Sequence, residues 1–343
     1  MIGGAKICSP LYKVNGVYSM DNQMKLNNYI EGALMAALAA MLALIGLYIT
    51  PLQVVTVFVW LVPIVVVSVR RGFYTGILAM ITAAILLIIL ATPWRAFIYL
   101  VQFAGLGIVF SYYFSKKANF SKIIMMGTIV VAISTIISFL LSFLVLGLSI
   151  SELSTAFEET TDSVLLMYER MGVLDRLQEQ GLTREEISNT VMNLSIMVAR
   201  LIPATMVIYG MMVAFVTYFI TRKTLQKLKL QVSELPMFRN WQIPWYFVWG
   251  VIVGLAFLLY GDFADWEIGK IIGMNIMYMY SPILFIQGLS VFVFYYHKWK
   301  IPGLLKVLLL VIIVLNIPLT LMVLLITGLF DPLFNYRRLE IKQ

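Results

Sequence analysis

Cysteine, histidine and charged residues are all scarce in this sequence. Its 343 residues include one cysteine, Cys8, and one histidine, His297. A single cysteine cannot form an internal disulfide or a thiolate cluster, and a single histidine excludes a multi-histidine metal site. Charged residues make up 12% of the chain, against about a quarter in soluble proteins. We therefore exclude a soluble enzyme, a nucleic-acid-binding module and a secreted disulfide scaffold, and we expect no metal and no cofactor.

The groups that an intramembrane enzyme needs are also missing from the apolar runs. These runs contain no aspartate and almost no glutamate, and the chain has no H-E-x-x-H motif. Such groups activate water or carry a metal in hydrolytic enzymes. The phosphate-binding pattern G-x-x-x-x-G-K-[ST] is absent as well, so the chain encodes no ATPase of that type. We expect a protein that is not an enzyme.

Apolar side chains are present in large excess. They make up 61% of the residues, and the mean hydropathy is +0.93. Because a membrane helix needs about 20 apolar residues, the sequence predicts an all-α polytopic membrane helix bundle of about nine transmembrane helices, within roughly eight to ten. The predicted spans are residues 30–50, 54–69, 76–91, 96–114, 123–150, 201–220, 244–260, 271–296 and 303–330. Asn316 and Pro318 interrupt the last span, which we interpret as one kinked helix.

Composition divides the chain into three parts. Residues 1–29 are less apolar and predict a flexible N-terminal segment without a cleaved signal peptide. Residues 30–230 predict a six-helix membrane domain that includes an extracellular loop at 151–190. Residues 231–343 predict a C-terminal domain of three spans.

The loop at 151–190 is amphipathic and acidic. It holds nine acidic and three basic residues. Apolar residues recur in it at helical spacing, and Thr183 with Glu186 matches a helix capping box. We expect two amphipathic helices on the membrane surface. They either only pack on the bundle or form a lid over a binding pocket.

Charge alternates between successive loops. One set of loops carries Arg70, Arg71, Lys116, Lys117, Lys122, the basic stretch 222–239, Lys298 and Lys300, whereas two loops of the other set hold twelve of the seventeen acidic residues. The positive-inside rule then predicts a bacterial plasma-membrane protein with a cytoplasmic N-terminus. One feature disagrees, because nine spans would place Arg337 and Arg338 outside. Either the last span is a re-entrant hairpin or these arginines have acidic partners.

Polar side chains in and near the spans are the candidate functional groups. Neutral ones typically form interhelical hydrogen bonds, and here they include Gln102, Asn193, Asn275, Gln287 and Ser290. Arg200 lies three residues before Pro203, and a charge within a membrane is a functional candidate, although Arg200 can also extend to the outer interface. We take Arg200, Asn193 and Gln102 as candidate solute-binding residues.

The first span carries a face of small residues. Ala36 and Ala40, and likewise Ala39 and Ala43, are four residues apart. Small residues at this spacing let two helix backbones approach closely. The pattern predicts a docking face, and it leaves open whether the neighbouring helix belongs to a partner or to the same chain.

Several short motifs resemble the YybS-like family of uncharacterised bacterial membrane proteins. They are Gly328-Leu329-Phe330-Asp331 with Phe334, Tyr336 and Arg337 after it, Gln287-Gly288-Leu289, and Arg200 with Pro203. The resemblance extends from about residue 28 to the end. It singles out Gln287, Gly288, Asp331 and Arg337 as signature residues. The chain departs from the family at Asn335, where an acidic residue is usual, and this weakens the case for a paired site with Asp331.

Residues 30–229 are also similar to the substrate-binding (S) components of energy-coupling-factor vitamin transporters. The alanine-rich first helix and the insertion before the sixth span carry this likeness. In those components an A-x-x-x-A face contacts a transmembrane coupling subunit, which implies the same role for Ala36/Ala40 and Ala39/Ala43. It also implies solute binding near the outer side, under the loop that leads into the sixth span.

Two hypotheses of function follow. The first is a non-enzymatic, S-component-like membrane protein that binds a small solute or docks to a coupling subunit, without an ATPase of its own. The second is a structural or scaffolding protein of envelope growth, division or sporulation, since a rod-shape protein belongs to the same broad fold group. The expected partners are the lipid bilayer, a coupling subunit or other membrane protein and a small solute, and no nucleic acid.

Overall fold

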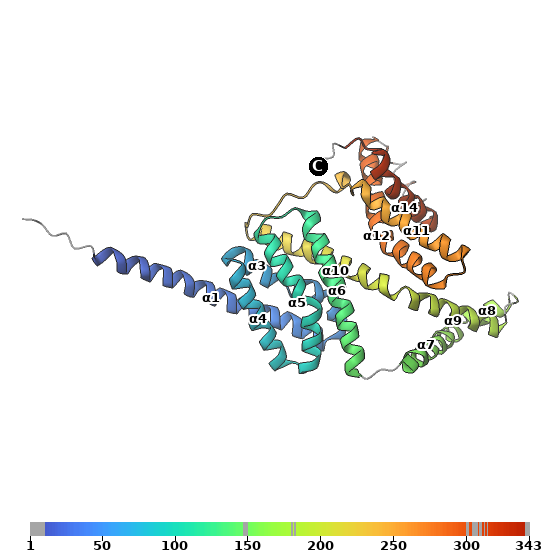
Figure 1. Cartoon of the computed structure of the whole chain (residues 1–343), viewed down its shortest axis with the longest axis horizontal. Helices are drawn as coiled ribbons and strands as arrows, with labels where there is room; N and C mark the ends of the chain where they lie inside the picture. Colours follow the sequence, from blue (N-terminus) through green and yellow to red (C-terminus); the bar gives the residue numbers. More distant parts are fainter. Residues whose placement is uncertain are drawn as a thin grey trace, which may run out of the picture. The chain divides into compact units, whose positions relative to one another are not determined.

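The computed structural model describes residues 11–146, 150–179, 181, 183–299, 302–303, 308, 311, 313 and 315–339. These residues form α-helices and two short 3₁₀ helices, with no strand among them. The helices are α1 (Leu11–Tyr48), α2 (Thr50–Val59), α3 (Val62–Arg71), α4 (Phe73–Leu90), α5 (Pro93–Ser115), α6 (Phe120–Leu146), α7 (Ile150–Arg170), α8 (Val173–Glu179), α9 (Arg184–Arg200), α10 (Ile202–Lys227), α11 (Val248–Phe263), α12 (Glu267–Lys298) and α14 (Ile317–Phe334). The 3₁₀ helices are η1 (Phe238–Asn240) and η2 (Trp245–Phe247). Figure 1 shows their order along the chain.

Nine helical segments in the described part are long and apolar enough to cross a membrane. They are Leu26–Tyr48, Thr50–Arg71, Phe73–Leu90, Pro93–Ser115, Phe120–Val145, Ile202–Lys227, Trp245–Phe263, Glu267–Lys298 and Ile317–Phe334. The predicted polytopic helix bundle is therefore confirmed. The second segment consists of α2 and α3, because the helix is interrupted at Trp60 and Leu61 just before Pro63.

The described chain divides into two compact units. Unit 1 contains residues 1–142 and 210–234, and unit 2 contains residues 143–209 and 235–343. The boundary near residue 234 lies close to the predicted one at residue 230. The acidic loop, however, groups with unit 2, whereas the sequence-based division assigned it to the N-terminal domain. That division into functional domains stays a prediction.

Two helix boundaries differ from the sequence-based expectation. Helix α1 begins at Leu11, so much of the predicted flexible segment 1–29 is helical, while residues 1–10 lie outside the described part. At the other end, Asn316 has non-helical dihedral angles (φ −124°, ψ 52°) and stands immediately before α14. The interruption at Asn316 is thus a helix start, and the crossing-length helix is Ile317–Phe334 rather than residues 303–330.

The alanine face of α1 packs inside unit 1. Ala36, Ala39, Ala40 and Ala43 are all buried. Helix α1 packs against α2, α3 and α4 of the same unit, so the small residues allow close packing within the chain. Of the two alternatives left open by the sequence, packing against helices of the same chain is observed. These four alanines therefore offer no free docking face to a partner.

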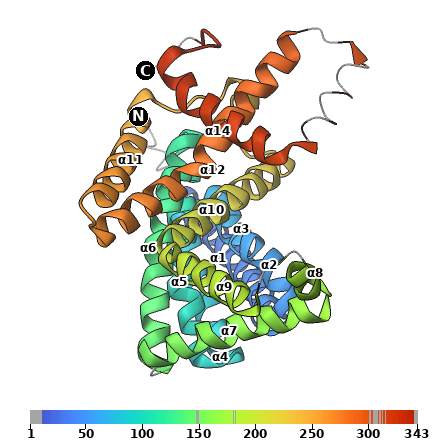
Figure 2. The ribbon, with the colours of Figure 1, turned by 90° about the vertical axis from the view of Figure 1, so that its right-hand side faces the viewer.

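The segment between α6 and α10 contains three helices, α7, α8 and α9, where two were predicted. Helices α7 and α9 lie side by side (Figure 2). The capping box is present: Thr183 Oγ1 accepts a hydrogen bond from the Glu186 backbone N–H at 3.2 Å, and the Glu186 carboxylate accepts one from the Thr183 N–H at 2.8 Å. These two bonds satisfy backbone donors that a helix start otherwise leaves unpaired.

Glycines allow α12 and α14 to cross at close range in unit 2. A β-carbon on Gly288 would lie 2.0 Å from the Leu324 carbonyl oxygen. Likewise, a β-carbon on Gly328 would lie 2.0 Å from the Leu284 carbonyl oxygen. Since both distances are far below van der Waals contact, each helix needs glycine where it meets the backbone of the other. This crossing positions the polar residues described next.

A buried charge cluster at the C-terminal end of α14

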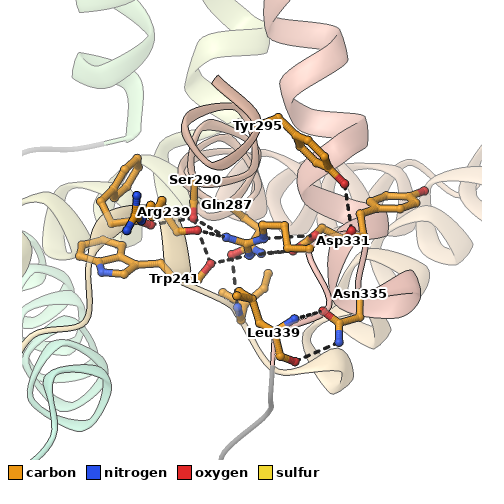
Figure 3. A network of polar contacts seen from close by, with 12 residues as sticks. Arg239, Trp241, Gln287, Ser290, Tyr295, Asp331, Asn335 and Leu339 are labelled. Carbon is orange, nitrogen blue, oxygen red and sulfur yellow. Dashed lines mark hydrogen bonds and ion pairs between the residues drawn. The ribbon is translucent and has the colours of Figure 1, made fainter. Parts of the chain in front are cut away.

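Asp331 and Arg337 form a fully buried ion pair. Asp331 lies on the last turn of α14, and Arg337 follows that helix. The Arg337 Nη2 and Asp331 Oδ2 atoms are 2.8 Å apart, and both side chains are 0% exposed. Figure 3 shows Asp331 in a polar network with Gln287 and Ser290. A buried charge requires compensation by pairing and hydrogen bonds, and the neighbouring residues provide both.

All five N–H donors of the Arg337 guanidinium have acceptors. Nε donates to Asp331 Oδ1 at 3.4 Å and Nη2 donates to Asp331 Oδ2 at 2.8 Å. Nη1 donates to the Arg239 carbonyl oxygen at 2.7 Å and to Ser290 Oγ at 2.8 Å. Nη2 also donates to the Trp241 carbonyl oxygen at 2.6 Å. Five is the full donor capacity of an arginine, so Arg337 is saturated.

Gln287 and Ser290 of α12 extend the network to the linker between α10 and α11. Gln287 Nε2 donates to Asp331 Oδ2 at 2.8 Å, and Gln287 Oε1 accepts from the Ile243 N–H at 3.2 Å. Ser290 Oγ lies 2.7 Å from the Phe238 carbonyl oxygen. We call Asp331, Arg337, Gln287 and Ser290 the clasp, because they join α12, α14 and the linker at residues 238–243.

Local sequence explains how each member reaches the clasp. On α12, Leu284, Gln287, Gly288 and Val291 follow the spacing of one helical face, and all are buried. On α14, Leu324, Gly328 and Asp331 do the same. After α14 the chain turns back at Asn335, which adopts a left-handed conformation (φ 45°, ψ 52°). Its side-chain Nδ2 and Oδ1 bond the Leu339 carbonyl oxygen and N–H, each at 3.0 Å, which holds the turn.

The geometry of the clasp indicates a structural role and not a ligand-binding one. Its charges neutralise each other, and the guanidinium has no donor left for a ligand. Removing one partner of a buried ion pair costs about 3–5 kcal/mol, because the remaining charge stays buried without compensation. The arrangement therefore holds the C-terminal segment and the linker in place.

The four signature residues taken from the sequence resemblance meet at this one place. Gln287, Asp331 and Arg337 are bonded to one another, and Gly288 permits the helix crossing beside them. The ion pair also shows that Asn335 is not needed as a second acid, because Arg337 is the partner of Asp331. The sequence offered an acidic partner for Arg337 as one alternative but did not identify Asp331 as that partner. It also did not anticipate the role of the Arg239 and Trp241 carbonyl oxygens, which a sequence pattern does not encode.

Arg200, the candidate solute-binding charge, lies at the end of α9 and forms an ion pair with Glu267 at the start of α12. Asn275 of α12 joins the same two elements: its Nδ2 donates to the Arg200 carbonyl oxygen at 2.7 Å, and its Oδ1 accepts from the Ala204 N–H at 3.0 Å. Asn275 thus satisfies backbone groups at the end of α9 and at the start of α10. The interhelical role predicted for neutral polar residues is observed here.

The other two candidate solute-binding residues belong to different units. Asn193 is exposed on α9 in unit 2, whereas Gln102 is partly buried on α5 in unit 1. Their assignment to a solute site stays a prediction. Among the described residues, no group of three or more histidine, cysteine, aspartate or glutamate side chains could hold a metal ion.

Comparison with known proteins identifies relatives. The family model described as predicted membrane protein DUF2232 matches residues 37–332. The uncharacterized protein YybS of Bacillus subtilis (strain 168) is 25% identical over 277 residues, which cover 80% of this chain and 85% of that protein. No solved structure matches this chain. The predicted YybS-like relationship is confirmed, while the likeness to S components stays a prediction.

Proposed function

We propose that this chain, which belongs to the DUF2232 family of predicted membrane proteins, is a non-enzymatic transport component of a bacterial plasma membrane. In this proposal unit 1 binds a small solute, and a partner protein supplies the energy for transport, as the predicted likeness of residues 30–229 to S components implies. The chain itself contributes binding and no ATP hydrolysis.

Buried hydroxyl groups without a hydrogen-bond partner within the spans of unit 1 support the proposal. Ser111 Oγ, Thr217 Oγ1 and Thr221 Oγ1 are buried and have no hydrogen-bond partner among the described residues. Hydroxyls in membrane helices commonly donate to the carbonyl one turn earlier, as Ser68 does to Ile64 at 2.8 Å. Buried polar atoms without partners are rare. The three hydroxyls therefore provide hydrogen-bonding capacity suited to an uncharged polar solute.

Binding at these hydroxyls requires movement of the helices that cover them. Ser111 lies on α5, and Thr217 and Thr221 lie one turn apart on α10. Phe114 of α5 stacks on Tyr218 of α10 with ring centroids 5.3 Å apart, so aromatic packing joins these two helices. We therefore expect an exchange between a packed state and a solute-bound state, with the stacked rings of Phe114 and Tyr218 separating in the latter.

Purification of the full chain in mild detergent tests the proposal. Mass spectrometry identifies small molecules and proteins that remain bound to the wild type. We expect Thr217→Val and Thr221→Val to lower the amount of bound solute at least several-fold. Thr82→Val is the matched control, because Thr82 is exposed and donates to the Leu78 carbonyl oxygen at 2.9 Å. Equal solute binding by all three variants would contradict the hydroxyl site.

Deletion of the protein in its host separates transport from the structural hypothesis. A defect in uptake of the co-purified solute supports the proposal. A chain that repeatedly carries neither solute nor partner, together with a shape or septation defect and normal uptake, would instead favour a role in envelope growth, division or sporulation.

A further inference from the structure

We infer that the chain ends on the same face of the membrane as the linker at residues 238–243, and that this face is cytoplasmic. The inference concerns membrane topology and does not depend on the proposed transport function. It rests on the clasp, on the pairing of α11 with α12, and on the distribution of charge around them.

The clasp places the two segments on one face. Arg337 donates to the carbonyl oxygens of Arg239 and Trp241 at 2.7 Å and 2.6 Å. In addition, the Tyr295 hydroxyl donates to the Tyr336 carbonyl oxygen at 2.9 Å. The hydrocarbon core of a bilayer is about 30 Å thick, much more than the length of an arginine side chain. Residues 336–337 and the linker therefore cannot lie on opposite faces.

Helices α11 and α12 form an antiparallel pair that leaves this face and returns to it. A β-carbon on Gly250 would meet the Tyr280 side chain, whereas one on Gly261 would lie 2.5 Å from the Lys270 backbone nitrogen. The start of α11 is thus level with the middle of α12, and the end of α11 is level with the start of α12. The chain crosses along α11, turns near Asp265, and comes back past the clasp to Lys298.

The chain between Lys298 and Asp331 consequently makes no net crossing. It starts and ends on the linker side. Helix α14 therefore does not carry the C-terminus to the opposite face, although its length and composition would allow it to cross the membrane. This accounts for the one exception to the charge rule, because Arg337 and Arg338 then share a face with the other basic loops. Of the two alternatives left by the sequence, the acidic partner of Arg337 is observed. A return of the C-terminal stretch to the same face follows from the inference.

Charge identifies the face. The chain leading into and through the linker is basic, with Arg222, Lys223, Lys227, Lys229 and Arg239 against the single acid Glu234. The turn at the opposite end of α11 and α12 carries Asp262, Asp265 and Glu267. By the positive-inside rule the linker is cytoplasmic, and the C-terminal segment is cytoplasmic with it.

Accessibility labelling of the full-length protein in intact cells tests the topology. In a Cys8→Ser background, we introduce one cysteine at an exposed position: Asn240→Cys in the linker, Tyr336→Cys after α14, or Ala264→Cys in the α11–α12 turn. A membrane-impermeant maleimide should label Ala264→Cys in intact cells. It should label Asn240→Cys and Tyr336→Cys only after permeabilisation. Labelling of Tyr336→Cys but not of Asn240→Cys in intact cells would overturn the inference.

Fusions at the C-terminus give a second, independent measurement if Tyr336→Cys is poorly reactive. A green fluorescent protein attached after Gln343 should fluoresce, and alkaline phosphatase attached at the same place should be inactive. An active phosphatase fusion with a dark fluorescent fusion would place the C-terminus outside and refute the inference.

Discussion

Asp331 and Arg337 show how a buried charge is tolerated at the level of single residues. Neither side chain has exposed surface, so each ion depends on its partner and on the surrounding hydrogen bonds. The cluster contains both signs of charge, neutral bridges from Gln287 and Ser290, and backbone carbonyl oxygens. Each of these groups replaces a hydrogen bond or a charge interaction that water would provide if the ions were exposed.

Removing either charge should destabilise unit 2. We expect Asp331→Asn and Arg337→Gln each to lower the free energy of unfolding by about 3–5 kcal/mol, because one buried ion is left unpaired. Thermal unfolding and hydrogen exchange at residues 238–243 in detergent measure the effect. Arg338→Gln is the control, since Arg338 is an exposed neighbour and exposed substitutions usually change stability by less than about 0.5 kcal/mol. Equal stability of Asp331→Asn and Arg338→Gln would contradict a structural role for the clasp.

At the scale of elements, α1 depends on small side chains where it packs. Ala40 is buried in unit 1, whereas Ala37 on the same helix is exposed. The spacing of alanines could be recognised in the sequence, but the packing partner could not, because the same small-residue pattern serves contacts within a chain and between chains.

Enlarging one buried alanine should separate α1 from its neighbours. We expect Ala40→Leu to cost about 1–3 kcal/mol through overpacking and Ala37→Leu to be nearly neutral. Thermostability of a fluorescent fusion in detergent compares the two variants. If Ala40→Leu folds as well as Ala37→Leu but loses a bound protein, the alanine face would be a docking surface after all.

The capping box makes the start of α9 sensitive to acid. Hydrogen bonds from the Thr183 backbone and side chain lower the pKa of Glu186 below its ordinary value of 4.5. A lowered carboxyl pKa contributes stability that is fully present above the ordinary value and is lost as the pH falls through the lowered one. Hydrogen exchange of the first turn of α9 should therefore accelerate relative to α10 below about pH 4.5.

Substitution separates the capping box from a general effect of acid. Glu186→Gln should remove most of this pH dependence, and Thr183→Ala should weaken the helix start by about 1 kcal/mol. Glu185→Gln is the control, since Glu185 shares the first turn of α9 but not the capping bonds. The same pH dependence in Glu186→Gln as in the wild type would rule out the capping box as its source.

At the scale of the whole molecule, the two compact units differ in the interactions that stabilise them. All residues of the clasp belong to unit 2, so unit 2 needs the chain beyond α14 to neutralise Asp331. Within the described residues, unit 1 relies on apolar packing and on the ion pairs of the partly buried Glu31 with Arg70 and Arg71.

Truncation should therefore affect the units unequally. We expect a chain that ends at Phe334 to lose protection from hydrogen exchange in α12, α14 and the linker, while α3 and α5 keep theirs. A chain that ends at Leu339 retains Arg337 and serves as the control. Loss of protection in both units of the shorter chain alone would show that they fold as one.

The sequence alone determined that this protein is a multi-pass helical membrane protein, and it located all but the last of the crossing segments. Lipid offers no hydrogen bonds, so each crossing must be an apolar helix whose backbone is satisfied internally. Such apolar runs can be recognised directly in the sequence. Only the tertiary structure decided that the alanine face is internal, that Asp331 pairs with Arg337, and that the chain beyond α14 meets the linker. These outcomes depend on which helices meet and at what level, and they involve backbone carbonyl oxygens that every residue possesses and no sequence pattern distinguishes.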